Sequence, residues 1–263
     1  MHPISEMPPE ICGQITTIFS DIDDTITTEG LIPAAAYSAL WHAKMAGINV
    51  IPVTGRPAGW CDHIARMWPV SAVVGENGAL AFALIDGRIQ RLWAERPEGA
   101  HKRLDIIRQR VLEEVPGCKV ATDQPYREYD LAIDFCEEVP PLAEAAIDKI
   151  VAIFQEEGAT AKVSSIHVNG WFGDFDKLTM CKRVSQELFG HALNPQGATF
   201  LGDSPNDVPM FAFFEHAIGV ANVNEMAHRM DTLPAYICEQ KGGEGFAEAV
   251  AHILRHRPEE KSR

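Results

Sequence analysis

Short runs of apolar and β-branched residues alternate with helix-like spacing over most of this 263-residue chain. Parallel strands need a long crossover between them, usually a helix, so this alternation favours a parallel sheet with helices on both faces. We therefore predict an α/β fold with a doubly wound, Rossmann-like core. The expected strands are residues 15–20, 48–53, 72–74, 198–201, 217–220 and 235–238, and the expected helices are 33–46, 58–67, 177–189, 205–214 and 245–254.

The middle of the chain has a different order of elements. Asp86 and Gly87 predict a hairpin turn. A helix, two strands, a second helix and two short strands follow, at 100–115, 118–122, 129–135, 141–156 and up to residue 169. This order predicts a small two-layer α+β cap inserted into the core. We expect a core of residues 1–85 and 170–263, a cap of residues 86–169, and a loose tail over the last eight residues.

Composition narrows the possible functions. Hydrophobic residues make up 46 % of the chain, which suits a large globular domain, and the formal net charge is −14. Such a charge argues against binding nucleic acid or an anionic membrane surface. The first residues lack the basic and apolar regions of a signal peptide, and six cysteines are scattered without a C-x-x-C pair. We expect a cytoplasmic protein with free thiols, either a monomer or a small homo-oligomer.

Polar residues directly follow several of the expected core strands. In doubly wound sheets ligands bind beyond the carboxyl ends of the strands, so side chains at these positions can converge. They are Asp21 and Asp23 after the first strand, Thr54, Gly55 and Arg56 after the second, and Asp203, Asn206 and Asp207 after a later one, with Lys177 at the start of the helix after the insert.

This mixture of carboxylates, a hydroxyl, an amide and cations has one natural chemical use. Carboxylates from separate strand ends can hold Mg²⁺, which prefers oxygen ligands and cancels their repulsion. A carboxylate beside the metal can attack a phosphorus atom whose oxygens are neutralised by the metal and by lysine. The set therefore predicts a site for phosphoryl transfer. Each motif alone has a simpler interpretation as a solvated turn or a capped helix start.

Taken together, the motifs resemble the haloacid dehalogenase superfamily, from about residue 15 to residue 254. The insert between the second and third motifs resembles the Cof-type branch of that superfamily. Sucrose-phosphate, trehalose-phosphate and mannosyl-3-phosphoglycerate phosphatases are similar in plan.

The resemblance implies a role for each motif residue. Asp21 is the expected nucleophile that becomes an aspartyl phosphate, and Asp23 the general acid and then the general base. The expected phosphoryl-binding residues are Thr54, Lys177 and Asn206, with Gly55 and Arg56 beside the substrate, and Asp207 would orient Lys177 or a metal-bound water. The expected metal site combines Asp21, Asp203, Asp207 and Asp23, the last through its backbone carbonyl.

Three features leave alternatives open. Asp24 stands where the commonest form of the first motif, D-x-D-G-T, has glycine. We expect its side chain to point away from the metal. Arg56 could contact phosphate or form a salt bridge with the loop. His167 and Asn169 alternate with Val168, so they share one side of a strand and could face the substrate, or could be ordinary polar residues of the strand surface.

We therefore expect a Mg²⁺-dependent phosphatase that hydrolyses a small phosphomonoester, a sugar phosphate or related metabolite, through an aspartyl phosphate. The alternative is a phosphomutase of the same build, and a weaker one is a non-catalytic binding domain on the same scaffold. Residues that select the substrate lie in the cap, and their geometry is not fixed by the sequence.

Overall fold

Six parallel strands form the central sheet of the computed structural model, which describes residues 1–257. Residues 258–263, most of the expected tail, lie outside the described residues. The predicted core strands are present, although most are shorter than expected, and the fold class is confirmed. In spatial order the strands are β1 (His2–Pro3), β13 (Tyr236–Ile237), β12 (Ile218–Gly219), β11 (Ala198–Gly202), β2 (Thr17–Ser20) and β3 (Asn49–Pro52).

Alternating side chains of these strands enter two hydrophobic layers. Ile18 and Val50 pack on one face of the sheet, whereas Phe19 and Ile51 pack on the other. The first face is covered by α1 (Pro9–Gln14), α2 (Ala34–Met45), α3 (Ala58–Met67) and α9 (Gly242–Arg255), and the second by α6 (Lys177–Arg183) and α7 (Val208–Phe213).

Two of the expected core helices are not continuous α-helices. A π-helical segment, Val184–Leu188, continues α6, and a 3₁₀ turn, Pro205–Asp207, precedes α7. A short helix, α8 (Val223–Met226), follows β12. None of the described helices has both the length and the apolar character needed to cross a bilayer.

The predicted hairpin belongs structurally with the core. Strands β4 (Val73–Gly75), β5 (Leu80–Ile85) and β6 (Arg88–Trp93) form an antiparallel sheet. Asp86 and Gly87 have φ angles of 50° and 73°, as a tight primed turn requires. Ala81 and Ala83 of β5 pack in the same hydrophobic layer as Phe19. The predicted boundary at 85/86 thus falls inside a hairpin of the core.

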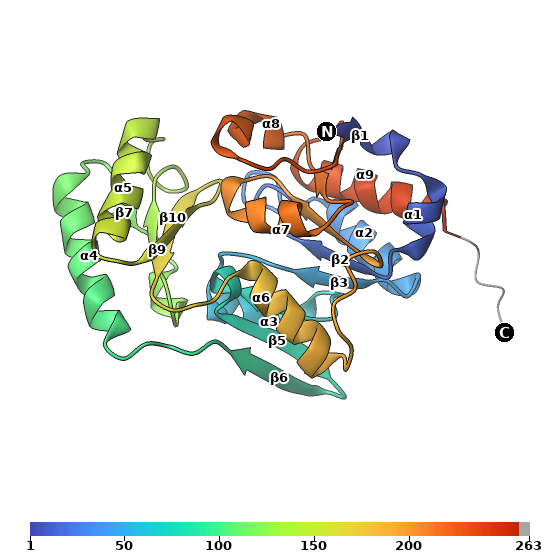
Figure 1. Cartoon of the computed structure of the whole chain (residues 1–263), viewed down its shortest axis with the longest axis horizontal. Helices are drawn as coiled ribbons and strands as arrows, with labels where there is room; N and C mark the ends of the chain where they lie inside the picture. The colour runs from blue at the N-terminus through green and yellow to red at the C-terminus, as the bar shows by residue number, and fades with distance from the viewer. Residues whose placement is uncertain (258–263) are drawn as a thin grey trace.

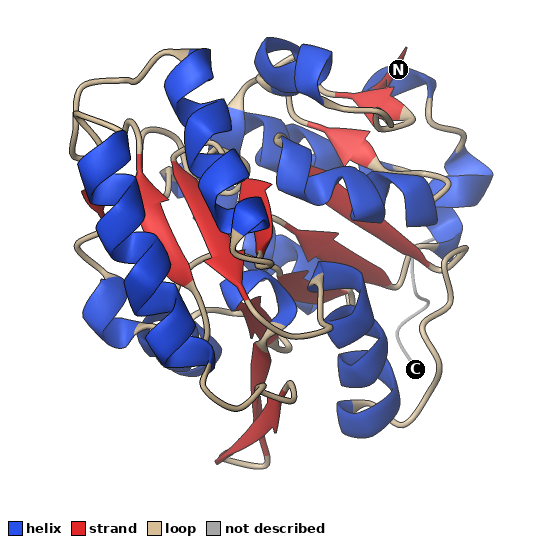
Figure 2. Cartoon of the chain, turned by 60° about the vertical axis from the view of Figure 1, so that its left-hand side comes forward, coloured by secondary structure: helices blue, strands red, loops and turns tan. Residues whose placement is uncertain are grey.

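The cap is a four-stranded antiparallel sheet with two helices on one face, as Figure 2 shows. Its predicted element order is present. Gly170 lets α5 lie close to the sheet, since a Cβ there would collide with Phe154. Figure 1 shows the cap beside the core. The elements are α4 (Ala100–Glu114), α5 (Glu144–Glu156) and strands β7 (Lys119–Val120), β8 (Leu131–Asp134), β10 (His167–Trp171) and β9 (Thr160–Val163) in spatial order.

The second predicted domain boundary, at 169/170, lies within β10. We propose that the boundaries lie in the connecting segments 94–99 and 172–176, which leave both the hairpin and the cap sheet intact. The chain then crosses between core and cap only where no described strand is cut.

Candidate active site

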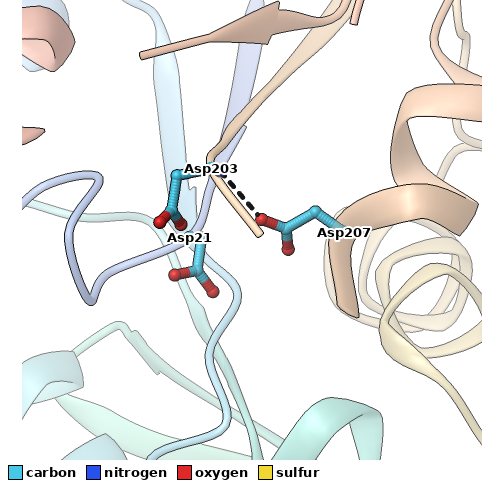
Figure 3. A group of neighbouring side chains, drawn as sticks. All are labelled: Asp21, Asp203 and Asp207. Carbon is cyan, nitrogen blue, oxygen red and sulfur yellow. Dashed lines mark hydrogen bonds between the residues drawn. The ribbon is translucent and has the colours of Figure 1, made fainter. Parts of the chain in front are cut away.

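Two neighbouring strands bring the predicted nucleophile and a predicted metal ligand together. Strands β2 and β11 are parallel, with Ser20 opposite Leu201, and the Asp21 amide donates to the Leu201 carbonyl at 2.8 Å. Asp21 and Asp203 therefore leave the sheet side by side, and Asp207 joins them from the following turn (Figure 3). One carboxylate oxygen of each residue lies within 4.8 Å of the others, and all three side chains are buried.

Lys177 is the cation of this cluster. Its Nζ donates to Asp21 Oδ1 and to Asp207 Oδ1, both at 2.6 Å, and the residue is 3 % exposed. It is positioned at the first turn of α6 because Asp176 caps that helix by accepting from the Thr179 amide at 2.6 Å. Burial would lower the pKa of Lys177, but the charges of Asp207 and Asp21 outweigh it and raise the pKa, so the ammonium group stays charged.

Asp207 and Asp203 differ in their partners. Asp207 Oδ2 accepts from the Asp203 amide at 3.1 Å, which together with Lys177 engages both of its oxygens. Asp203 instead accepts from two neutral donors, the Thr25 hydroxyl at 3.2 Å and Asn222 Nδ2 at 3.0 Å. Asp207 thus holds the lysine in place, whereas the charge of Asp203 has no direct cationic partner among the described residues.

The charge balance of this cluster fits a divalent cation. Burial raises the pKa of Asp21 to about 8 against the opposing charge of Lys177, and the charges of Asp207 and Asp23 add to the rise. Burial and the charges of Asp21 and Asp207 also raise the pKa of Asp203 well above its usual range. Three buried carboxylates share one ammonium group and offer only oxygen ligands, which suits a hard cation such as Mg²⁺.

Asp23 is not part of this group of three carboxylates and contacts Arg56. Arg56 Nη2 lies 2.8 Å from Asp23 Oδ1, and Nε lies 3.0 Å from the same oxygen. The guanidinium group also contacts the cap, with Nη2 at 2.6 Å from Glu137 Oε1 and Nη1 at 3.5 Å from Asp123 Oδ2. Of the two alternatives for Arg56, the structure therefore shows the salt bridge with the loop. Its predicted contact with substrate stays a prediction.

Thr54, which follows β3, is fully buried. Its Oγ accepts from the Arg56 amide at 3.0 Å, so the hydroxyl proton remains available to another acceptor. This geometry is compatible with the predicted contact between Thr54 and a phosphoryl oxygen.

Three asparagines meet around Gly55. A Cβ on Gly55 would lie 3.2 Å from Asn77 Nδ2 and 3.4 Å from Asn169 Oδ1, so a side chain there would crowd both. Asn206 Nδ2 donates to Asn77 Oδ1 at 3.4 Å. Asn77 Nδ2 is buried and has no hydrogen-bond partner among the described residues. The structure thus brings Asn169 of the cap to the predicted core residues Gly55 and Asn206, and adds Asn77.

The two predicted cap residues, His167 and Asn169, lie on the core side of β10, each 2 % exposed. His167 Nε2 lies 2.8 Å from Glu137 Oε2, and Asn169 Nδ2 donates to Asp130 Oδ2 at 2.9 Å. Burial alone would raise the pKa of Glu137, but the close contacts with His167 and Arg56 hold it at about 2. His167 is therefore connected to Asp23 through Glu137 and Arg56.

Other residues that join cap and core were not identified from the sequence. Buried Glu76 accepts from the amides of Ala58 at 3.0 Å and Tyr129 at 2.6 Å. Arg127 Nη1 donates to the Gly55 carbonyl at 2.7 Å. No local sequence pattern indicates these two contacts between cap and core, because the residues of each pair lie more than fifty positions apart in the sequence. Asn222 could have been found, since it follows β12 as the other polar residues follow their strands.

Asp24 adopts a left-handed conformation with φ of 55°. Aspartate tolerates this conformation better than most residues, which explains how the loop accommodates the loss of the glycine. The Asp24 carboxylate is not part of the group formed by Asp21, Asp203 and Asp207. It lies on the wall of a crevice between core and cap, together with Glu29 and Ser165.

Known proteins resemble this chain in sequence. Residues 18–92 match the family model of the haloacid dehalogenase-like hydrolases. A curated relative, the phosphoglycolate phosphatase of Haloarcula marismortui, is 26 % identical over 245 residues, covering 88 % of this chain and 94 % of the relative.

Solved structures share the fold. Sucrose-phosphatase from Synechocystis, solved with sucrose and phosphate, superposes with a TM-score of 0.63 at 17 % identity, covering 92 % of this chain and 98 % of that one. The C-terminal domain of C. albicans trehalose-6-phosphate phosphatase gives 0.70 at 13 % identity, covering 94 % and 96 %. The solved structures confirm the fold, and the family match and the archaeal relative confirm the predicted resemblance and the predicted class of enzyme, a phosphoric monoester hydrolase.

Proposed function

We propose that this chain, a haloacid dehalogenase-like hydrolase, is a Mg²⁺-dependent phosphatase that hydrolyses a small phosphomonoester of the sugar-phosphate kind through an aspartyl phosphate. One observation carries the proposal: Asp21, Asp203 and Asp207 converge, and Lys177 is the one cation among the described residues that contacts them. A cluster with surplus negative charge binds a cation, and the cation together with Lys177 attracts a phosphate. The sugar phosphatases among the structural neighbours favour the substrate class.

The residues of the site divide the reaction between them. A carboxylate oxygen of Asp21 attacks phosphorus, and the bond from phosphorus to the leaving oxygen breaks while Asp23 donates a proton to that oxygen. Asp23 then takes a proton from water as the water oxygen attacks phosphorus, which breaks the bond to Asp21 and releases phosphate. Lys177 and the Thr54 hydroxyl stabilise charge on the transferring phosphoryl oxygens.

Asp21 and Asp203, with the Asp23 carbonyl, would hold Mg²⁺. The bound cation supplies charge neutralisation on the phosphoryl oxygens and lowers the repulsion that Asp21 would feel as it approaches them. Asp207 acts through Lys177, which it holds at 2.6 Å, and Arg56 orients the Asp23 carboxylate.

The cap would exclude bulk water and contact the leaving group. Buried contacts on its core side support this role, in particular Glu76 with the Tyr129 amide and Arg127 with the Gly55 carbonyl. A closed cap over a phosphoryl site favours hydrolysis of metabolites small enough to fit beneath it. We also propose a cytoplasmic location, which the six free cysteines favour.

An assay of phosphate release tests the proposal. The panel contains p-nitrophenyl phosphate, hexose 6-phosphates, sucrose and trehalose phosphates, phosphoglycolate and phosphoglycerates, each with Mg²⁺ and with EDTA. Asp21→Asn, purified in parallel, controls for a contaminating phosphatase. We expect release that needs Mg²⁺ and that is lost in Asp21→Asn.

Two results would contradict the proposal. Conversion of one sugar phosphate into its isomer, with net phosphate conserved and a bisphosphate required, would indicate a phosphomutase. Binding of phosphate esters without turnover of any compound would indicate a non-catalytic domain.

A further inference from the structure

Two neighbouring cavities of about 400 and 340 Å³ lie in a crevice lined by residues of both core and cap. Asp24, Glu29 and Ser165 line both cavities. We call this space the acidic crevice. Its other charged lining residues are Asp23, Arg56 and Glu137 in the first cavity and Asp203, Glu225 and Lys241 in the second.

The position of Asp23 indicates which part of a substrate enters this crevice. In the proposed reaction Asp23 gives its proton to the leaving oxygen, so the leaving group lies against Asp23. The phosphoryl group lies at Asp21 and Lys177, and neither of these residues lines the crevice. The acidic crevice is therefore the space open to the leaving group, and Ile166 and Ser165 of the cap form its opposite wall.

The cations that line the crevice are already paired with carboxylates. Arg56 contacts Asp23 at 2.8 Å and Glu137 at 2.6 Å, and Lys241 Nζ lies 2.6 Å from Glu225 Oε1. Asp24 and Glu29 form no salt bridge with the described residues. An anionic group placed beside Asp24 and Glu29 would meet surplus negative charge, with no unpaired side-chain cation among the described lining residues to receive it, whereas hydroxyl or ammonium groups would find acceptors.

We propose that the acidic crevice selects phosphomonoesters whose leaving alcohol is neutral or positively charged, such as polyols and amino alcohols, and rejects those that carry a carboxylate or a second phosphate. This inference rests on the proposed phosphatase function and assigns Asp24 and Glu29 as specificity-determining residues. The inference also predicts that phosphoglycolate, the compound in the name of the archaeal relative, is a poor substrate of this chain, since its leaving group carries a carboxylate.

Matched pairs of substrates test this inference at pH 7 with saturating Mg²⁺. Phosphoethanolamine and phosphoglycolate share a two-carbon leaving group and differ in the charge at its end. Glucosamine 6-phosphate and 6-phosphogluconate make the same comparison with six carbons. We expect kcat/KM to be higher for the amine than for the acid by at least about tenfold in each pair, the effect of one unfavourable charge contact at short range.

Two variants locate the source of this preference. Asp24→Gly removes a charge at a residue with φ of 55°, where glycine fits without strain, and Glu29→Gln removes the other unpaired charge at φ of 51°. Each should lower the amine-to-acid ratio by about threefold or more. Glu113→Gln, on the exposed side of the cap helix α4, changes the net charge equally and should leave the ratio unchanged.

The outcomes separate this inference from the proposed function. Equal or faster hydrolysis of the acids would overturn the inference and leave the phosphatase intact, as would a preference for amines that neither Asp24→Gly nor Glu29→Gln reduces. No hydrolysis of any of these compounds or of p-nitrophenyl phosphate would contradict the proposed function itself.

Discussion

The two aspartates of the first motif, Asp21 and Asp23, lie two residues apart but have partners in different parts of the molecule. Asp21 is held by Lys177 and lies beside Asp203 and Asp207, so its partners all come from the core. Asp23 is held by Arg56, whose other carboxylate partners, Glu137 and Asp123, come from the cap. The core side is buried, whereas the cap side includes Glu137 and Asp123 and so requires the cap to lie on the core.

This difference assigns separate parts of the reaction to separate parts of the chain. In the proposed reaction, attack on phosphorus depends on residues of the core alone, but protonation of the leaving group depends on a carboxylate whose orientation the cap influences. Substitutions on the core side should therefore abolish chemistry, and those on the cap side should alter rate and pH dependence.

Loss of the core cation should have the largest effect. In Lys177→Met, Asp21 and Asp207 lose their shared ammonium group, and kcat/KM should fall by at least about 10³-fold. The stability should also fall, by about 3 kcal/mol, because buried carboxylates lose their partner. Steady-state kinetics and urea unfolding measure the two effects. Lys182→Met, an exposed lysine on the same helix, should retain activity; an active Lys177→Met would contradict the assignment.

The second largest effect should come from loss of Asn222, which donates a hydrogen bond to Asp203. Asn222→Ala removes the 3.0 Å hydrogen bond to Asp203 Oδ2, and the Mg²⁺ concentration for half-maximal activity should rise about 10- to 100-fold. Titration of activity with Mg²⁺ measures the change. Asn224→Ala, two residues away and exposed, provides the control. An unchanged Mg²⁺ requirement in Asn222→Ala would place the cation elsewhere.

On the cap side, Arg56→Lys should have a smaller effect. Lysine keeps the charge but cannot contact Asp23 and Glu137 through one planar group, so kcat should fall about tenfold and its pH profile should change. A pH series of kcat for this variant and for the exposed control Arg66→Lys makes the measurement. If KM rises in Arg56→Lys while kcat stays unchanged, Arg56 binds the substrate instead of orienting Asp23.

Loss of the Glu137 carboxylate should have the smallest effect, a decrease in the free energy of unfolding that depends on pH. Its pKa is held at about 2, below the usual value of 4.5, so its contribution to stability is fully present above about pH 4.5 and is lost as the pH falls toward 2. The side chain is partly exposed, so we expect only about 1 kcal/mol. The free energy of unfolding of the wild type minus that of Glu137→Gln, measured from pH 7 to pH 2.5, should shrink toward zero. A constant difference would mean that the carboxylate charge is not what joins cap and core.

The core side could be predicted from the sequence for a physical reason. Parallel neighbouring strands end at the same edge of a sheet, so polar residues directly after β2 and β11 had to meet, and Asp21 and Asp203 do. The same rule reaches Asn222 after β12. The two covering layers follow from apolar runs that are buried on both faces, as Ile18 and Phe19 illustrate.

The cap side could not be predicted in the same way. The contact between Arg56 and Glu137 joins residues 81 positions apart in the sequence, and it depends on where the inserted cap comes to rest. The hairpin around Asp86 was recognised, but nothing local shows that Ala81 and Ala83 pack on the core and not on the cap. The two-residue strand β1, His2–Pro3, has no apolar pattern and exists only because β13 pairs with it.

Trapping the product of the first chemical step would show whether Asp21 attacks phosphorus. The wild type is mixed with excess substrate and Mg²⁺, quenched with acid during turnover, digested and analysed by mass spectrometry. The expected result is a phosphoryl group on Asp21, absent when EDTA replaces Mg²⁺ and absent in Asp21→Asn. Phosphate release at an unchanged rate by Asp21→Asn, or a phosphoryl group trapped on another residue, would contradict it.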